Sequence, residues 1–169
     1  INISSLPTLK QTYRDPVYFL ALGFGSGLSP KAPGTCGSLV ALLVYLPFSL
    51  LSDWAYITCI LFAFVLGVYV CGVAAQRLDV KDPGSIVWDE FVGMWIALIM
   101  NPVGWSYLFL AFVFFRIFDI FKPWPLNYLD RNFEGGLGVM IDDVAAGVYS
   151  LALVQIVALF VVALDLTLP

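Results

Sequence analysis

Long runs of hydrophobic residues, separated by short polar stretches, make up most of the chain. The clearest run covers residues 54–76 and contains no charged side chain. A helix needs about 20 predominantly apolar residues to cross a bilayer, so this run predicts a transmembrane helix. Four further runs are shorter or carry a few charges: residues 39–52, 86–100, 105–121 and 141–164. The pattern predicts an all-α, polytopic membrane bundle of about four or five transmembrane helices.

The stretches between these runs predict the remaining elements. The apolar segment 17–24 is too short to cross a bilayer and predicts an interfacial or re-entrant helix. Residues 25–38 are rich in Gly, Pro and Ser and predict a loop, and the later polar stretch predicts a short helix near 124–132. A length of 169 residues suits one domain. We therefore expect residues 1–169 to form a single membrane-embedded domain.

Composition supports the membrane interpretation. Hydrophobic residues make up 61% of the chain, charged residues only 12%, and the mean hydropathy is +0.93. Soluble domains average about 25% charged residues, so this chain lacks the charge to cover a water-exposed surface. The net charge of −4 argues against nucleic acid as a partner. The chain has no histidine, which excludes histidine nucleophiles, general bases and metal ligands. Three cysteines without paired spacing indicate neither a disulfide framework nor a zinc site.

The basic residues fall on one side of the predicted membrane layout. With five spans, that side holds the N-terminal region and the loops after the second and fourth spans. The turns on the opposite side contain only the acidic residues Asp53 and Asp165. Lys and Arg are enriched in cytoplasmic loops, so the basic side is predicted to be cytoplasmic. All eight Lys and Arg residues lie on or next to it: Lys10, Arg14, Lys31, Arg77, Lys81, Arg116, Lys122 and Arg131.

A group of charged residues lies within or at the ends of the apolar runs, where charges are costly to insert into a membrane. Such residues are candidates for a functional role. In the predicted layout they share one depth, because the third and fifth spans begin, and the fourth span ends, at the cytoplasmic side. We therefore expect them to converge on one site. They are Asp89, Glu90, Arg116, Asp119, Lys122, Asp142 and Asp143.

Small residues follow these acids at helical spacing. Gly93 comes four residues after Asp89, and Gly147 comes four residues after Asp143. Small residues on one face allow helices to approach closely, so we expect the spans that carry the acids to pack together. Carboxylates in the first turn of a helix are also favoured by the helix dipole. Simple N-terminal capping is therefore the alternative interpretation of Asp89, Asp142 and Asp143.

The residue types point to a phosphate–metal site. Clustered carboxylates without histidine or paired cysteine are hard oxygen ligands, which suit Mg²⁺, Mn²⁺ or Ca²⁺. Mg²⁺ commonly combines a few carboxylates with water and substrate phosphate. The cations Arg116, Lys122 and Lys31 can bind phosphate oxygens. Backbone N–H groups before a helix also bind anions, and the residues that offer them here are Gly34, Thr35, Gly37 and Ser38. The alternative for these four residues is a plain turn.

A small ion-coupled transporter is the alternative from another functional class, because intramembrane acids also bind transported ions. Transport sites tend to lie near the bilayer midplane, whereas these acids are predicted at one end of their helices. The spans also show no two-half symmetry. The depth of the acids is therefore the feature that separates the two hypotheses.

Four long motifs carry a resemblance to a known family. They are GFGSGLSPKAPGTCGS (23–38), GSIVWDEFVGMW (84–95), FRIFDIFKPWP (115–125) and LDRNFEGGLGVMIDDVAAG (129–147). Together they resemble the phosphatidylglycerophosphatase A family in the same order along most of the chain. The resemblance implies an all-helical, Mg²⁺-dependent phosphatase of the bacterial inner membrane. Its substrate would be the phospholipid phosphatidylglycerophosphate, which would lose its terminal phosphate to give phosphatidylglycerol.

The expected division of roles follows from the site and this resemblance. Four acids, Asp89, Glu90, Asp142 and Asp143, are expected to hold one or two Mg²⁺ ions, with Asp119 as a further ligand or base. Lys122 and Arg116 would stabilise the charge of the phosphoryl transition state. Asp130 is a candidate base or a partner that orients Lys122, and its alternative is a solvated acid paired with Arg131. Direct attack by water and an aspartyl-phosphate intermediate both stay open.

Overall fold

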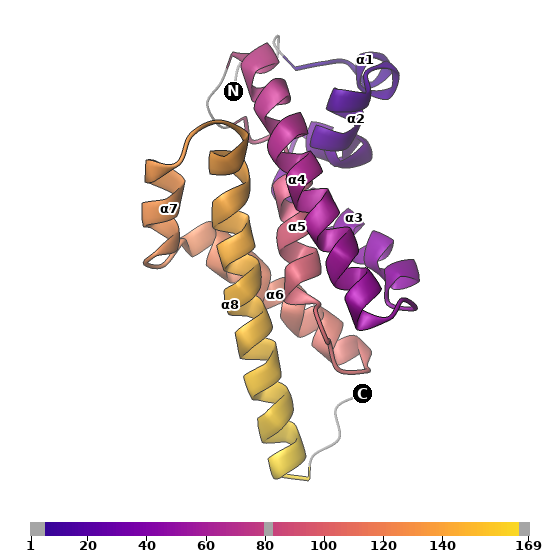
Figure 1. The fold of residues 1–169 in the computed structure, drawn as a ribbon, viewed down its shortest axis with the longest axis vertical. Coiled ribbons are helices and arrows are strands. Elements are labelled where there is room, and N and C mark those ends of the chain that lie inside the picture. The colour runs from indigo at the N-terminus through magenta and orange to yellow at the C-terminus, as the bar shows by residue number, and fades with distance from the viewer. Residues whose placement is uncertain (1–5, 80–82, 166–169) are drawn as a thin grey trace.

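The computed structural model describes residues 6–79 and 83–165, apart from the side chains of Asp130 and Arg131. Every regular element in these ranges is a helix (Figure 1), which confirms the all-α prediction for this part of the chain. The elements are α1 (Leu9–Arg14), α2 (Pro16–Ala21), the 3-10 helix η2 (Gly23–Leu28), α3 (Pro33–Phe48), α4 (Asp53–Leu78), α5 (Trp88–Ala97), α6 (Trp105–Phe121), α7 (Leu126–Asn132) and α8 (Gly135–Ala163).

Several boundaries agree with the sequence pattern. Helix α6 covers the predicted run 105–121, α4 contains the predicted run 54–76, and α7 lies within the predicted short helix 124–132. The apolar segment 17–24 forms α2 and the beginning of η2. Its interfacial position stays a prediction.

Two helices begin earlier than the sequence pattern indicates. The predicted loop 25–38 is wrong at both ends, because residues 25–28 belong to η2 and α3 begins at Pro33; proline is well suited to the first position of a helix. Helix α8 begins at Gly135 rather than at residue 141. Glycine disfavours helix formation, but a Cβ on Gly136 would lie 1.8 Å from the carbonyl oxygen of Val68 in α4. Close packing on α4 therefore accounts for the early start.

The third predicted span is too long. Helix α5 ends at Ala97 and not at residue 100, and Met100 has a positive φ of 50°. Pro102 follows closely and disfavours helical geometry in the residue before it. Every residue of α5 except Glu90 is buried. This short helix is thus the centre of the described structure and contacts α3, α4, α6 and α8.

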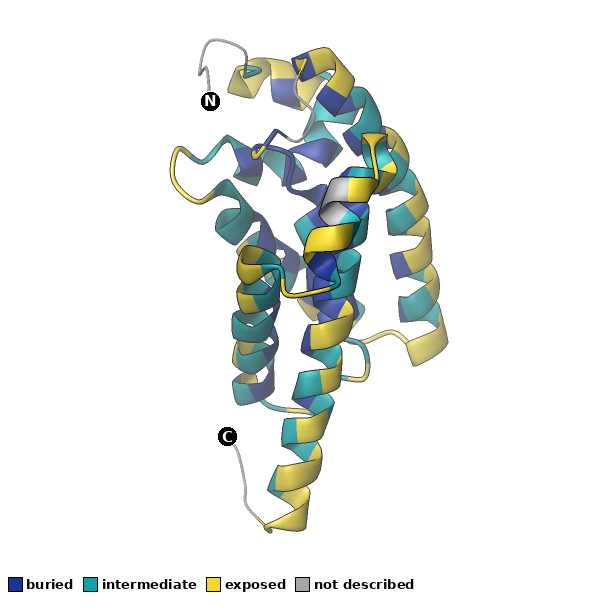
Figure 2. Ribbon diagram, turned by 90° about the vertical axis from the view of Figure 1, so that its left-hand side faces the viewer, coloured by how far each residue is buried: buried dark blue, intermediate teal, exposed yellow. Residues whose placement is uncertain are grey.

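Two helices, α4 and α8, are long and apolar enough to cross a membrane. Only 33% of the most apolar stretch of α4 and 22% of that of α8 are buried inside the protein, whereas the core helix of a soluble protein is mostly buried. Figure 2 shows the exposed surface that continues along α8. Helices α3 and α6 are shorter, about 24 and 26 Å at 1.5 Å per residue. The larger number of spans therefore stays a prediction.

Side-chain contacts fix the directions of the helices. Trp88 Nε1 donates to the carbonyl of Ala63, and Tyr56 Oη donates to the carbonyl of Trp95, so α4 and α5 are antiparallel. Ser150 in α8 donates to Ala111 in α6, and the later residues of α6 contact earlier residues of α8, so these helices are antiparallel too. The C-terminal end of α6 lies near the third turn of α8 and, through the contact of Arg116 with Glu90, near the first turn of α5.

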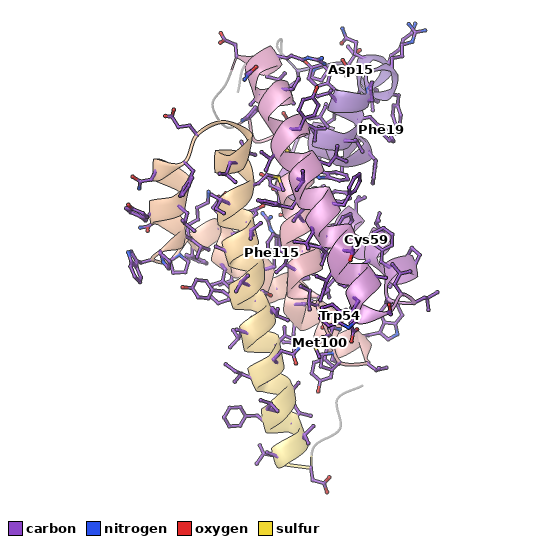
Figure 3. All side chains as sticks on the ribbon, in the orientation of Figure 1. Asp15, Phe19, Trp54, Cys59, Met100 and Phe115 are labelled. Atoms are coloured by element: carbon purple, nitrogen blue, oxygen red, sulfur yellow. The ribbon has the colours of Figure 1, made fainter. Side chains whose placement is uncertain are left out.

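Two glycines bring α5 and α8 together, as the sequence predicted. A Cβ on Gly147 would lie 2.4 Å from the carbonyl oxygen of Gly93, and a Cβ on Gly93 would lie 2.6 Å from that of Asp143. No larger residue fits at this crossing without moving a backbone. Phe115 of α6 packs against the same point and lies in the middle of the molecule in Figure 3. Asp89 precedes Gly93 by one helical turn, as Asp143 precedes Gly147, so the crossing sets the distance between these acids.

Candidate active site

Three acids from α5 and α8 form a compact group. One carboxylate oxygen each of Asp89, Glu90 and Asp143 lies within 4.8 Å of the other two. Asp89 and Asp143 are buried, and the side chain of Glu90 is 12% exposed. Asp89 and Glu90 lie in the first turn of α5. The structure therefore brings together three of the four acids that the sequence predicted as metal ligands.

Arg116 reaches this group from α6. Its Nη1 lies 2.6 Å from Asp119 Oδ2 and 3.9 Å from Glu90 Oε1, and it donates to Ser38 Oγ over 3.2 Å. The start of α3 packs against Glu90 and Arg116. A Cβ on Gly34 would lie 2.2 Å from Glu90 Oε1 and 3.3 Å from the Arg116 guanidinium. Gly34 thus permits a contact between α3 and the acid group that a larger residue would block.

Lys122 and Asp142 form a separate pair beside the three acids. Lys122 Nζ donates to Asp142 Oδ2 over 2.6 Å, and the two side chains are 28% and 9% exposed. Asp142 is one residue from Asp143 in α8, so the two carboxylates leave the helix on different faces. Asp142 was predicted as a metal ligand, and in this structure it contacts Lys122 and lies outside the three-acid group.

The acids of α8 lie deeper in their helix than the sequence predicted. Because α8 begins at Gly135, Asp142 and Asp143 belong to its third turn. N-terminal capping, the alternative interpretation of these two residues, is therefore excluded by the helix boundary. It still applies to Asp89, whose Oδ1 accepts a hydrogen bond from the backbone N–H of Glu90.

The charge of the site is unbalanced. Five carboxylates surround two cations, and the acids outnumber the bases in the set Asp89, Glu90, Asp119, Asp142, Asp143, Arg116 and Lys122. Glu90 Oε2 and Arg116 Nε are buried and have no hydrogen-bond partner in the described structure. Leaving such a group unsatisfied costs about 1–3 kcal/mol, and more for a charged one. A bound cation would offset both the excess of negative charge and the unpaired carboxylate oxygen.

The remaining predicted site residues lie around α3 and α7. Lys31 is exposed in the turn before α3, and no ion pair joins it to the acids among the described residues. The first bond of α3 runs from Cys36 N to Ala32 O, so the N–H groups of Gly34 and Thr35 precede the helical ladder. Those of Gly37 and Ser38 fall within it. A Cβ on Gly37 would lie 2.7 Å from Val87, and Ser38 contributes its hydroxyl to Arg116. The side chain of Asp130 lies outside the described residues.

Comparison with known proteins decides the family. The family model described as phosphatidylglycerophosphatase A matches residues 19–158. The chain belongs to the phosphatidylglycerophosphatase A family. The resemblance expected from the four motifs is therefore confirmed, and the chain is an enzyme of the phosphatase class. No solved structure matches it.

Three relatives are similar to this chain over most of their length. Phosphatidylglycerophosphatase A of Escherichia coli is 49% identical, with 80% of each chain covered. Phosphatidylglycerophosphatase A of Haemophilus influenzae is 44% identical, with 88% of this chain and 92% of the relative covered. A protein of Bacteroides thetaiotaomicron, whose name assigns it provisionally to the phosphatidylinositol-3-phosphatases, is 42% identical, with 81% and 90% covered. None of the three is named as a transporter, so the transporter alternative gains no support.

The Lys122–Asp142 pair gives a first prediction for this family member. We expect Lys122→Gln to lower kcat/KM for phosphate release by about 100-fold, because the positive charge expected to stabilise the phosphoryl transition state is lost. Asp142→Asn should lower it as well. Since each change breaks the same 2.6 Å contact, the double variant should lose much less than the product of the two effects. Steady-state kinetics of the four proteins check this, and fully multiplicative losses would show that the two residues act independently.

Proposed function

We propose that the chain hydrolyses the terminal phosphomonoester of phosphatidylglycerophosphate in a Mg²⁺-dependent reaction that yields phosphatidylglycerol and inorganic phosphate. The observation that carries this proposal is the group of Asp89, Glu90 and Asp143 next to Arg116 and Lys122. Hard oxygen ligands beside two phosphate-binding cations are what a metal-dependent phosphatase needs. The names of two relatives supply the lipid headgroup.

The three acids fit Mg²⁺ better than a softer metal. They offer only carboxylate oxygens, the ligands that Mg²⁺ prefers, and the unpaired Glu90 Oε2 is an acceptor without a donor among the described residues. We assign Asp89, Glu90 and Asp143 as the residues that hold the ion. Asp142 and Asp119 complete the acidic surroundings. When bound, Mg²⁺ neutralises phosphate oxygens and lowers the pKa of a bound water molecule.

The remaining roles in the reaction belong to residues of the chain itself. Hydrolysis breaks the bond between phosphorus and the terminal glycerol oxygen, and that oxygen takes up a proton while the oxygen of water joins phosphorus. Lys122 donates to a phosphate oxygen as negative charge spreads over the phosphoryl group. Arg116 is held in place by Asp119 and Ser38, so it is oriented before substrate arrives. The N–H groups of Gly34 and Thr35 offer further donors to the phosphate.

We further propose that the protein is a multi-pass protein of the bacterial inner membrane, with this site on the cytoplasmic face. Exposed aromatic residues support it. Trp124 (80% exposed) and Tyr128 (58%) lie shortly after the C-terminal end of α6, while Trp105 (75%) begins α6 and Trp54 (81%) lies in the first turn of α4. Trp and Tyr are enriched at both membrane interfaces, and α6 is about 26 Å long, close to the roughly 30 Å of a hydrocarbon core.

The positions of the basic residues indicate which side of the membrane the site faces. The described basic residues lie in α1, in the turn before α3, at the end of α4 and in the last turns of α6. In Figure 3, Trp54 of α4 and Met100, which follows α5, lie in the lower part of the molecule. Asp15 and the charged side chains of α1 lie at its upper end. Cytoplasmic loops carry an excess of Lys and Arg, which supports a cytoplasmic site.

The test is phosphate release in detergent from two phosphomonoester lipids, phosphatidylglycerophosphate and phosphatidylinositol 3-phosphate. We expect release from phosphatidylglycerophosphate to stop after EDTA treatment and to return on addition of excess Mg²⁺. A faster reaction with phosphatidylinositol 3-phosphate would overturn the headgroup assignment and favour the activity named for the Bacteroides relative. Activity that survives EDTA would overturn the metal assignment.

A further inference from the structure

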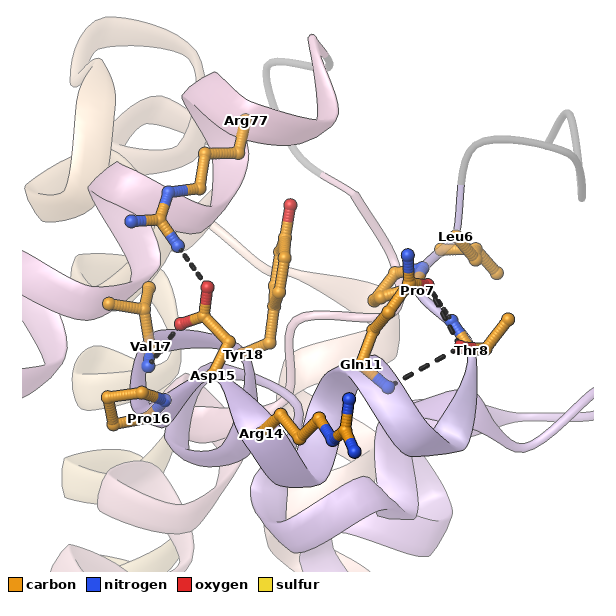
Figure 4. A pocket seen from close by; sticks show the side chains of 10 residues that line it. All are labelled: Leu6, Pro7, Thr8, Gln11, Arg14, Asp15, Pro16, Val17, Tyr18 and Arg77. Atoms are coloured by element: carbon orange, nitrogen blue, oxygen red, sulfur yellow. Dashed lines mark hydrogen bonds and ion pairs between the residues drawn. The ribbon is translucent and has the colours of Figure 1, made fainter.

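A pocket with a volume of about 840 Å³ lies between α1, α2 and the C-terminal end of α4. Cavities that bind small ligands typically measure about 300–1,000 Å³. None of its lining residues belongs to the acid cluster formed by Asp89, Glu90 and Asp143. The lining residues are Leu6, Pro7, Thr8, Gln11, Arg14, Asp15, Pro16, Val17, Tyr18 and Arg77 (Figure 4). The pocket is therefore separate from the candidate active site.

An ion pair fixes one wall of this pocket. Arg77 Nη1 lies 2.7 Å from Asp15 Oδ2, and the Arg77 guanidinium lies 5.7 Å from the centre of the Tyr18 ring. Figure 4 shows Arg77 directed toward Asp15 beside the Tyr18 ring. A guanidinium has five N–H donors, and Asp15 accepts from only part of them. Arg77 is thus held in one orientation with donors left for a ligand.

The carboxylate and side-chain amide acceptors that line the pocket already have hydrogen-bond partners. Asp15 Oδ1 accepts from the N–H of Val17, and Oδ2 faces Arg77. Gln11 Oε1 accepts from the backbone and the hydroxyl of Thr8 in the capping box of α1. The amide NH₂ of Gln11 and the guanidinium of Arg14 have no partner among the described residues. The pocket consequently presents donors and positive charge, which select an anion.

We propose that this pocket binds the phosphate group of an anionic phospholipid at a site separate from the active site. Phosphate offers several acceptor oxygens to the donors of Gln11, Arg14 and Arg77, which line the same pocket. Leu9 and Tyr13 of α1 are 62% and 63% exposed, which places apolar surface next to the basic residues. A short segment with both features binds the interface of an anionic membrane.

The test is equilibrium binding by isothermal titration calorimetry in dodecyl maltoside micelles, which contain no phosphate. The probe is dihexanoyl phosphatidylglycerol, with inorganic phosphate and dihexanoyl phosphatidylcholine as comparison ligands. Arg14 is suitable for substitution because it is exposed and pairs with no described residue. Lys10 provides the matched control: it is an exposed base on the same helix and does not line the pocket.

We expect Arg14→Gln to weaken phosphatidylglycerol binding about tenfold, Arg14→Lys to weaken it less, and Lys10→Gln to change it less than about twofold. Equal effects of Arg14→Gln and Lys10→Gln would overturn the proposal in favour of diffuse charge attraction. Binding that Arg14→Gln leaves intact would place the lipid elsewhere, for example at the acid cluster, and would overturn it too. Equally tight, Arg14-dependent binding of inorganic phosphate would overturn the lipid as the source of the phosphate.

Discussion

Replacing Asp143 by Asn is expected to reduce Mg²⁺-dependent phosphate release about 1,000-fold, the loss that corresponds to roughly 4 kcal/mol of transition-state stabilisation. Asp143 is 3% exposed, and one of its carboxylate oxygens lies within 4.8 Å of a carboxylate oxygen of Asp89 and of Glu90. The substitution keeps the shape of the side chain and removes one negative charge from the proposed metal site. The remaining activity should require a much higher Mg²⁺ concentration for half-saturation, which a titration of initial rates measures.

Two further variants make this experiment specific. Asp142→Asn alters the neighbour that pairs with Lys122, so it should lower the rate without a comparable change in the Mg²⁺ requirement. Asp165→Asn alters an exposed acid beyond the end of α8 and should leave both quantities within about twofold. If folded Asp143→Asn protein keeps more than a tenth of the wild-type rate at the same Mg²⁺ concentration, the assignment of Asp143 as a ligand is wrong.

Gly147→Ala is expected to cause a large loss of stability, because it adds a methyl group where α5 and α8 cross. The new Cβ would lie 2.4 Å from the carbonyl oxygen of Gly93 and 3.1 Å from Cβ of Ile96. Overpacking of this kind costs about 3 kcal/mol, which lowers the midpoint of thermal unfolding by about 6–12 °C for a chain of this size. Thermal unfolding in detergent, followed by tryptophan fluorescence, measures the shift.

The control for this substitution is Val148→Ala, one residue further along α8. Val148 is 50% exposed, so shortening it should shift the midpoint by less than about 2 °C. Gly147→Ala should also reduce activity in the fraction that remains folded, since Asp143 lies one turn before the crossing. Equal midpoints for the two variants would show that the helices separate at this point without cost.

The sequence predicted the identity of most of the site, because charge inside an apolar run is rare and has few structural explanations. Asp89, Glu90, Asp143, Arg116 and Asp119 were expected together and are found together. What it could not predict is the pairing within the set. The contacts of Lys122 with Asp142, and of Arg116 with Ser38, depend on helix rotation, which a hydropathy pattern does not determine.

Helix boundaries were less predictable than helix positions. Local propensity predicts a loop for the Gly-rich segment before Asp142. The close approach of Gly136 to α4 instead makes a helix the better-packed conformation. The start of α3 was missed because Gly34, Thr35 and Ser38 are typical of turns. Tertiary contacts reversed the local preference in both places, and the start of α3 lies beside the acid group. The pocket between α1, α2 and α4 left no sequence signal, because Asp15 and Arg77 are far apart in the chain.

The unequal lengths of the helices that hold Lys122 and Asp142 link the site to the thickness of the bilayer. In the multi-pass arrangement proposed above, the apolar part of α8 after Asp143 is about 30 Å long and α6 is about 26 Å long, so the two helices match one hydrocarbon thickness at different tilts. A thinner membrane increases the tilt of the longer helix, and the end of α6 then shifts relative to the third turn of α8. The Lys122–Asp142 contact joins these two points. In that proposed arrangement, acyl-chain length in the surrounding membrane is therefore expected to change the geometry of the site without any lipid entering it.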